Sequence, residues 1–262
     1  MDLHLRGKTA VVTGASKGIG RAIAQGLAVE GVDLVLCARS EGLLSSLADE
    51  LAATHEVQAH CLAADLATAD GVAALAAFAI ERLGHVDILV NNAGAIPAGT
   101  IETLGDEEWR ESYDLKLWSY VRLARALLPD MKRQGGGVII NIIGNAGKRP
   151  SAGYIAGGIA NAGLMNFTAG LAQDAGPYGV RVVGINPGLT RTERMDQLID
   201  RQARERGVTV EQQAQEMGRG VPLRRVGEPS EVADLAVFLA SDRAAYITGC
   251  VIPIEGGATA AL

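Results

Sequence analysis

The sequence predicts a single α/β domain over residues 1–262, in which a parallel sheet is covered by helices on both faces. Short apolar runs rich in β-branched residues alternate with stretches whose apolar residues recur at helical spacing. The strand-like runs are apolar at consecutive positions, which is typical of strands buried on both faces of a parallel sheet. Neither a low-complexity linker nor an internal repeat interrupts this alternation, so the pattern indicates one domain.

Each element follows from its local pattern along the chain. The stretch TAVVTG is the first expected strand and GRAIAQGLAVEG is the first expected helix, and the two types then alternate. The expected strands cover residues 9–14, 33–39, 58–66, 87–94, 136–144, 180–188 and 249–257. The helices between the first four strands cover residues 20–31, 42–55 and 71–84.

One segment, at about residues 189–222, departs from the regular alternation. It is polar and lies between a strand and the following helix. This pattern indicates a helical flap over the edge of the sheet where the strands have their carboxyl ends. A pair of solvated surface helices explains the same pattern equally well.

Composition excludes several classes of partner. The formal net charge is −6, and no basic block exceeds a dipeptide, which argues against nucleic acid or an anionic membrane as a partner. No apolar run reaches the roughly 18 residues of a membrane span, and the N-terminus does not resemble a signal peptide. Three widely spaced cysteines show no metal-binding spacing and favour a reducing cytoplasm, so we expect a cytoplasmic protein without a metal site.

The segment TGASKGIGRAIA joins the first expected strand to the first expected helix. Its glycines Gly14, Gly18 and Gly20 allow a tight turn and a close backbone approach to a pyrophosphate, which the helix N-terminus favours electrostatically. A tight turn that needs glycine only for packing is the alternative. The strand–loop–helix context favours dinucleotide binding.

Together with NNAG at residues 91–94 and NPG at residues 186–188, this loop resembles the short-chain dehydrogenase/reductase family. The ending EVADLAVFLASDRAAYITGCVIPIEGG is also similar to that family, so the resemblance covers nearly the whole chain. It implies a Rossmann-type, doubly wound sheet of about seven parallel strands and a nicotinamide cofactor.

Residues at the second strand favour NADP(H) over NAD(H). The strand ends in Arg39 rather than in an acidic residue, and Lys17 lies in the glycine loop, so two cations are available for a ribose 2′-phosphate. A solvated Arg39 is the alternative. The resemblance implies that the cofactor contacts Gly14, Ser16, Lys17, Gly18, Ile19, Gly20, Arg39, Asp65, Leu66, Asn92, Ala93, Gly94, Pro187, Gly188, Thr190 and Thr192.

The residues that catalyse the reaction in this family are replaced. The family uses an Asn, a Ser, a Tyr and a Lys to stabilise and protonate the alkoxide formed by hydride transfer. A gapless register through NAGLMNFTAGLAQDAG places Lys116, Gly144, Gly157 and Asn161 at those four positions, in that order. A register that uses Tyr154 as the family tyrosine needs a gap and still leaves Gly158 where lysine belongs.

A rebuilt acid is one explanation of these replacements. Lys116 and Asn161 have exchanged places relative to the family, and Gly157 leaves room for the phenol of Tyr154 one helical turn earlier. We therefore expect a Tyr154–Lys116 pair, with Asn161 holding ribose or water and the cation lowering the pKa of the phenol. Alternatively, Tyr154 is a packing residue and Lys116 pairs with Asp114 or Glu111.

The function expected from this pattern is an oxidoreductase for a carbonyl or secondary alcohol. Glycines at positions 144 and 157 predict a substrate larger than average, and the loop cations Lys148 and Arg149 are candidates for binding its carboxylate. A lyase or isomerase on the same scaffold and a catalytically silent NADP-binding protein are the alternatives. The family resemblance implies a homodimer or homotetramer.

Overall fold

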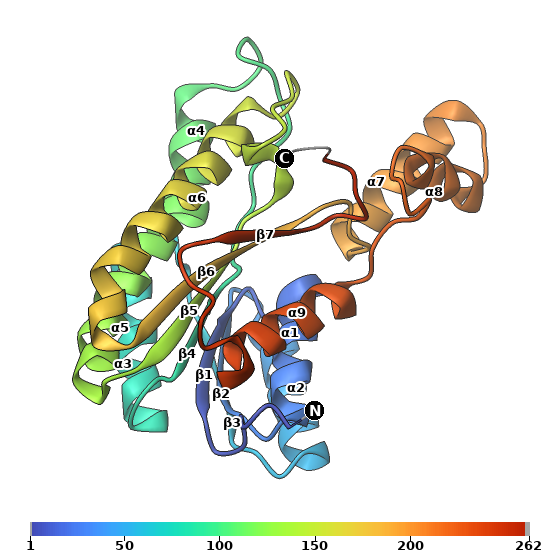
Figure 1. Cartoon of the computed structure of the whole chain (residues 1–262). Helices are drawn as coiled ribbons and strands as arrows, with labels where there is room; N and C mark the ends of the chain where they lie inside the picture. The colour runs from blue at the N-terminus through green and yellow to red at the C-terminus, as the bar shows by residue number, and fades with distance from the viewer. Residues whose placement is uncertain (1, 260–262) are drawn as a thin grey trace.

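The computed structural model describes residues 2–259 and contains one seven-stranded parallel sheet (Figure 1). The strand order is β3-β2-β1-β4-β5-β6-β7, and every neighbouring pair is parallel. The strands are β1 (Thr9–Thr13), β2 (Asp33–Ala38), β3 (Ala59–Ala63), β4 (Ile88–Asn91), β5 (Gly137–Ile142), β6 (Val180–Pro187) and β7 (Val251–Ile254). The predicted Rossmann-type α/β class is confirmed.

Helices cover both faces of this sheet, as Figure 1 shows. One buried apolar cluster joins the sheet to α1, α2 and α9, and a second joins it to α3, α5 and α6. The helices are α1 (Gly18–Val29), α2 (Glu41–Thr54), α3 (Ala69–Leu83), α4 (Asp106–Tyr113), α5 (Ser119–Gln134), α6 (Ile155–Ala175), α7 (Glu193–Arg206), α8 (Val210–Arg219) and α9 (Pro229–Ala240). No helix among residues 2–259 is long and apolar enough to cross a bilayer.

The strand order reverses between β1 and β4, and hydrogen bonds join the loops that follow these two strands. The Asn92 amide donates to the Thr13 carbonyl at 3.0 Å, while the Thr13 hydroxyl accepts the Asn92 N–H at 2.8 Å. A doubly wound sheet binds its ligand outside the carboxyl ends of the strands at this reversal. The fold therefore places the glycine loop and NNAG side by side at a ligand crevice.

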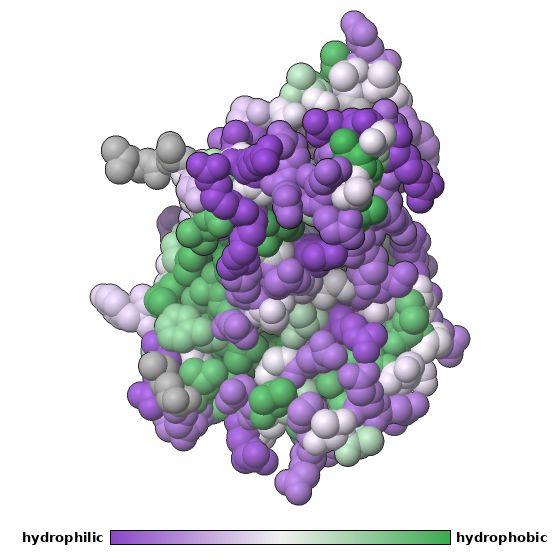
Figure 2. All heavy atoms as spheres, turned by 90° about the vertical axis from the view of Figure 1, so that its right-hand side faces the viewer, coloured by the Kyte–Doolittle hydropathy of each residue, from purple (hydrophilic) through white to green (hydrophobic). Residues whose placement is uncertain are grey.

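Helices α7 and α8 form a unit that projects from the carboxyl edge of the sheet (Figure 1). Its outer surface is mainly hydrophilic in the view of Figure 2. Thr192 accepts the Met195 N–H and caps the first turn of α7, and its methyl group lies 3.1 Å from the point that a Cβ of Gly18 would occupy. We call α7 and α8 the flap, because this capped N-terminus lies against the glycine loop.

A substitution at Gly20 tests whether the glycine loop is packed as closely as the structure shows. A Cβ at position 20 would overlap the Gly14 carbonyl, so Gly20→Ala should lower the free energy of unfolding by about 1–3 kcal/mol. Gly170→Ala is the matched control, because Gly170 lies within α6 with no atom within 4 Å of its Cβ position, and it should stabilise by up to about 1 kcal/mol. Denaturant unfolding of both variants checks this; equal effects would contradict the packing.

Candidate functional site

Two neighbouring cavities lie along the carboxyl edge of the sheet. The cavity at the β2 end has a volume of about 320 Å³ and contains several residues that the sequence predicts for the adenosine half of the cofactor. The predicted residues that line it are Gly14, Ser16, Lys17, Arg39, Leu66, Ala93 and Gly94. Arg39 is exposed, and neither it nor Lys17 has a carboxylate partner among residues 2–259.

The second cavity has a volume of about 510 Å³ and extends from the glycine loop to the ends of β5 and β6. It shares Gly14, Lys17, Ala93 and Gly94 with the first cavity, so the two meet at the glycine loop. The other predicted residues that line it are Gly18, Ile19, Asn92, Lys116, Gly144, Pro187 and Thr192. We call this second space the reaction cavity.

Lys116 is the buried cation of the reaction cavity. It lies in a π-helical turn, Asp114–Trp118, between α4 and α5, and is 9% exposed. Its Nζ donates to the Ile142 carbonyl at 2.8 Å and to the Tyr120 hydroxyl at 3.1 Å, and that hydroxyl donates to the same carbonyl at 2.9 Å. π-Helical turns often occur at functional sites because they redirect a side chain.

The charge of Lys116 is not balanced by a carboxylate among the described residues. Asp114, which the sequence offers as an alternative partner for this lysine, pairs instead with Arg122 at 3.1 Å. Burial lowers the pKa of Lys116 from its ordinary value of 10.5 to about 7, and the positive charge of Arg194 contributes to this lowering. An amine in this state can both donate and accept a proton near neutral pH.

Three glycines make room for the side chains of Lys116, Tyr154 and Asn161. A Cβ at Gly94 would overlap the Lys116 chain, and a Cβ at Gly157 would overlap the ring of Tyr154. At Gly144, which has φ +130°, a Cβ would lie 2.9 Å from the Asn161 amide nitrogen. The Tyr154 ring thus occupies the room beside Gly157, as expected, while Gly144 lines the reaction cavity with the Asn161 amide beside it.

Tyr154 directly precedes α6, and its ring lies in the space beside Gly157. It packs in a small apolar cluster with Ile96 and Trp109, and burial raises the pKa of its phenol while Arg194 opposes that rise. No hydrogen bond joins it to Lys116 in the described part of the chain, and it does not line the reaction cavity. The structure thus pairs Lys116 with Tyr120, at a spacing of four residues that the sequence analysis did not consider.

Arg194 is the second residue that the sequence analysis did not identify. It lies in the first turn of α7, lines the reaction cavity, and donates through Nη2 to the Ile96 carbonyl at 2.7 Å. Its position depends on how the flap meets the loop after β4, which no local pattern reveals. The candidates Lys148 and Arg149 do not line this cavity, and Arg149 donates to the Ala258 carbonyl instead.

The remaining predicted residues lie around the two cavities without lining them. Gly20 packs on the Gly14 carbonyl, the Asp65 carboxylate accepts the Ala67 N–H, and the Thr190 hydroxyl donates to the Gly188 carbonyl. These residues shape the loops that carry the lining residues. No group of three or more potential metal ligands occurs among residues 2–259.

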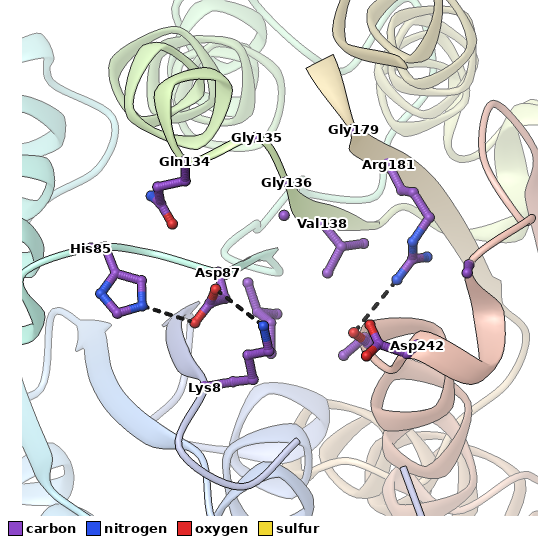
Figure 3. A pocket seen from close by; sticks show the side chains of 14 residues that line it. Lys8, His85, Asp87, Gln134, Gly135, Gly136, Val138, Gly179, Arg181 and Asp242 are labelled. Atoms are coloured by element: carbon purple, nitrogen blue, oxygen red, sulfur yellow. Dashed lines mark hydrogen bonds and ion pairs between the residues drawn. The ribbon is translucent and has the colours of Figure 1, made fainter. Parts of the chain in front are cut away.

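A third cavity, of about 640 Å³, lies at the opposite edge of the sheet (Figure 3). His85 and Lys8 both approach the Asp87 carboxylate, at 3.2 and 3.7 Å, and Arg181 donates to the Ser241 carbonyl at 3.2 Å. The Asp87 carboxylate thus has two basic partners within the protein, and the Arg181 guanidinium is held by backbone carbonyls. It also lies away from the carboxyl ends of the strands, where sheets of this type bind ligands.

Comparison with known families agrees with this geometry. The family described as short chain dehydrogenase matches residues 8–203. The match begins just before β1 and ends within α7, so it includes both cavities and the start of the flap.

Individual relatives match along nearly their whole length. The NADPH-dependent reductase BacG of Bacillus subtilis is 32% identical over 254 residues, which are 95% of this chain and 97% of the relative. The oxidoreductase UcpA of Salmonella typhimurium is 37% identical, over 97% of this chain and 95% of its own. The crystal structure of L-sorbose reductase from Gluconobacter frateurii, complexed with NADPH and L-sorbose, has a TM-score of 0.97 at 36% identity and covers all of both chains.

Because the Lys116 amine is buried, a variant that lacks it should be more stable than the unmodified protein, by an amount that depends on pH. Lys116→Met should raise the free energy of unfolding by up to a few kcal/mol, since one pKa unit corresponds to about 1.4 kcal/mol. The gain should be full below pH of about 7, where the folded chain holds a buried ammonium, and should fade toward pH 10.5, where the unfolded lysine is also neutral. Denaturant unfolding at several pH values measures it.

The exposed Lys148 provides the control. Lys148→Met should change stability little at any pH, because its ammonium remains hydrated in the folded chain. A gain from Lys116→Met that does not vary with pH would show that the Lys116 pKa is not lowered by folding.

Proposed function

The chain belongs to the short-chain dehydrogenase/reductase family, and on this basis we propose that it is an NADP(H)-dependent oxidoreductase with an active site rebuilt around Lys116. The observation that carries the proposal is the pair of cavities that meet at the glycine loop, one beside Arg39 and the other beside Lys116. An extended dinucleotide has the same arrangement, with a pyrophosphate between two nucleoside halves. The reaction is hydride transfer between nicotinamide and a carbonyl or secondary alcohol.

The residues at the β2 end fit a 2′-phosphorylated ribose. Arg39, Ser40 and Lys17 line that cavity together, and no acidic side chain lines it. A guanidinium and an ammonium neutralise a phosphate that an aspartate in the same place would repel. The NADPH-dependent relative BacG and the NADPH complex of L-sorbose reductase support the same choice of cofactor.

At the other end, Lys116 is the proposed proton donor. A bound NADPH would supply the hydride that the carbonyl carbon accepts, and would itself be oxidised to NADP⁺. The Lys116 ammonium gives its proton to the carbonyl oxygen, so the products are the alcohol and a neutral amine, which regains a proton from solvent. In the oxidation direction the neutral amine accepts the alcohol proton.

The contacts of Lys116 suit this role. The Ile142 carbonyl and the Tyr120 hydroxyl orient the amine while leaving it on the surface of the reaction cavity. Tyr120 itself is fully buried, so it positions Lys116 rather than meeting substrate. Tyr154 and Asn161 fill the space beside glycines 157 and 144, and we propose that they support the cavity wall from behind, with Gly144 itself on the cavity surface.

Exposed apolar side chains support the proposal of a homo-oligomer. Trp118, in the π-helical turn before α5, is 46% exposed, and Ile159 of α6 is 52% exposed. Large apolar side chains left in water on adjoining helices favour burial against a second copy. Trp118 lies two residues from Lys116, so self-association at this face would reinforce the turn that holds the lysine.

Arg39 gives a direct test of the cofactor. Arg39→Ala should weaken NADPH binding about 10- to 100-fold, because a hydrogen bond to a charged group contributes about 1.5–3 kcal/mol. NADH binding should change less than about threefold, since NADH lacks the phosphate. Fluorescence titration of both nucleotides measures this; an equal loss for both would show that Arg39 does not contact a 2′-phosphate.

Lys116 gives the test of the chemistry. In an absorbance screen of NADPH oxidation with aldehydes, ketones and quinones, Lys116→Met should lower kcat about 10²- to 10⁴-fold and leave NADPH affinity within about threefold. Tyr154→Phe keeps the ring beside Gly157 and should lower kcat much less. A large loss in Tyr154→Phe with little loss in Lys116→Met would instead assign the proton to Tyr154.

The pH dependence of the reaction has a fixed sign. Reduction needs the Lys116 ammonium, so kcat for reduction should fall as the pH rises above about 7, and kcat for oxidation should fall below it. Steady-state rates in both directions measure the two profiles. If kcat for reduction and kcat for oxidation changed in the same direction with pH, Lys116 would be excluded as the group that transfers the proton.

Nucleotide binding without turnover of any carbonyl would favour the alternative function, a catalytically silent NADP-binding protein.

A further inference from the structure

The reaction cavity carries an excess of positive charge near Lys116. Its charged lining residues are three cations, Lys17, Lys116 and Arg194, and one acid, Glu193. Lys17 also lines the cavity at the β2 end, where it faces the phosphates of the proposed cofactor. Arg194 and Lys116 remain as the two cations at the end of the cavity where substrate would react.

Arg194 is held in place but is not neutralised. Its Nη2 donates to the carbonyl of Ile96, a residue that is 2% exposed and packed against α6, so one end of the guanidinium has a rigid anchor. A neutral carbonyl satisfies one N–H and leaves the positive charge without a counterion. Among residues 2–259 no carboxylate lies within 4 Å of Arg194, whereas Arg191, which lies just before the flap, pairs with Asp196 at 3.3 Å.

The acid beside Arg194 in sequence does not provide that counterion. A Glu193 carboxylate oxygen lies 3.6 Å from the position of a Cβ at Gly18, so this carboxylate is directed at the glycine loop. The charge of Arg194 instead acts toward Lys116 and Tyr154: it adds to the lowering of the Lys116 pKa that burial causes, and it opposes the rise that burial causes in the Tyr154 pKa. The guanidinium is therefore within electrostatic reach of both side chains.

We propose that Arg194 binds a carboxylate on the substrate, so that this protein acts on keto acids or hydroxy acids rather than on neutral carbonyl compounds. The carboxylate would accept hydrogen bonds from guanidinium N–H groups that do not point at Ile96, the second N–H of Nη2 among them, in the paired geometry typical of arginine and carboxylate. The reacting carbonyl of the same molecule then lies at Lys116. This assignment rests on the proposed hydride transfer, and Arg194 belongs to the flap, so the substrate itself would join the flap to the sheet.

The test uses matched pairs of acids and esters. The probes are aliphatic keto acids with four to eight carbons and their methyl esters, with NADPH oxidation followed for the full chain. The unmodified protein should favour the acids over the esters by at least about tenfold in kcat/KM, as expected for a charge-assisted hydrogen bond. Arg194→Met should remove that preference by lowering the ratio of kcat/KM for each acid to that for its ester, a ratio in which an effect on Lys116 common to both substrates cancels.

Two further variants make the result specific. Arg194→Lys keeps the positive charge on a single nitrogen and should retain part of the preference for acids over esters. The same variant checks that the flap folds without a guanidinium at this position. Arg191→Met removes the same charge just before the flap, outside the reaction cavity, and should leave the ratio of acid to ester unchanged. Equal losses for acids and esters in Arg194→Met, or a preference for esters in the unmodified protein, would overturn the assignment.

A binding measurement separates this inference from the proposed reaction. The thermal unfolding midpoint of the NADPH-bound protein is measured with each acid and each ester. If NADPH binds but no probe is reduced, the proposed reaction fails. A rise in the midpoint with the acids that disappears in Arg194→Met would still support the carboxylate site, and the lack of any rise with the acids would overturn it.

Discussion

The buried amine of Lys116 is the constraint on which the rest of the site depends. A lysine removed from water without a carboxylate partner loses much of its preference for the charged state, so its pKa falls to about 7. The Ile142 carbonyl at the end of β5 and the Tyr120 hydroxyl fix the amine at the reaction cavity. Both groups belong to elements packed in the core, so the position is set by the fold. Buried titratable groups with strongly shifted pKa values cluster at functional sites, which agrees with the proposed role of Lys116 in proton transfer.

The residues around Lys116 depend on one another sterically. Lys116 crosses Gly94, the ring of Tyr154 fills the space at Gly157, and Asn161 approaches Gly144. A serine at position 144 would have to adopt φ +130° and meet the Asn161 amide, and a tyrosine at position 157 would meet the ring of Tyr154. Changing either glycine alone would therefore strain the site. Residues in direct contact are expected to couple in this way.

The sequence was sufficient to predict the sheet, because buried parallel strands and glycine turns leave strong local patterns. It also located both halves of the crevice, since the glycine loop and NNAG follow adjacent strands. The pairing of Lys116 with Tyr120 was not predicted, although the two are four residues apart, because Tyr154 lies nearer to the family position of the tyrosine. Arg194 could not be found from local pattern at all, since its role depends on how the flap packs against the Ile96 carbonyl. The approach of the Asn161 amide to Gly144 could not be predicted for a related reason, because the two residues belong to different elements that meet only in the fold.

Direct titration of the Lys116 side chain is the measurement closest to the central claim. In protein labelled with ¹³C at the lysine ε-carbon, the signal that disappears in Lys116→Met identifies this residue, and its chemical shift can be followed against pH. We predict a midpoint near 7, far from the ordinary value of 10.5. A midpoint that coincides with those of the surface lysines would show that the amine is hydrated, and the site would then need a different proton donor.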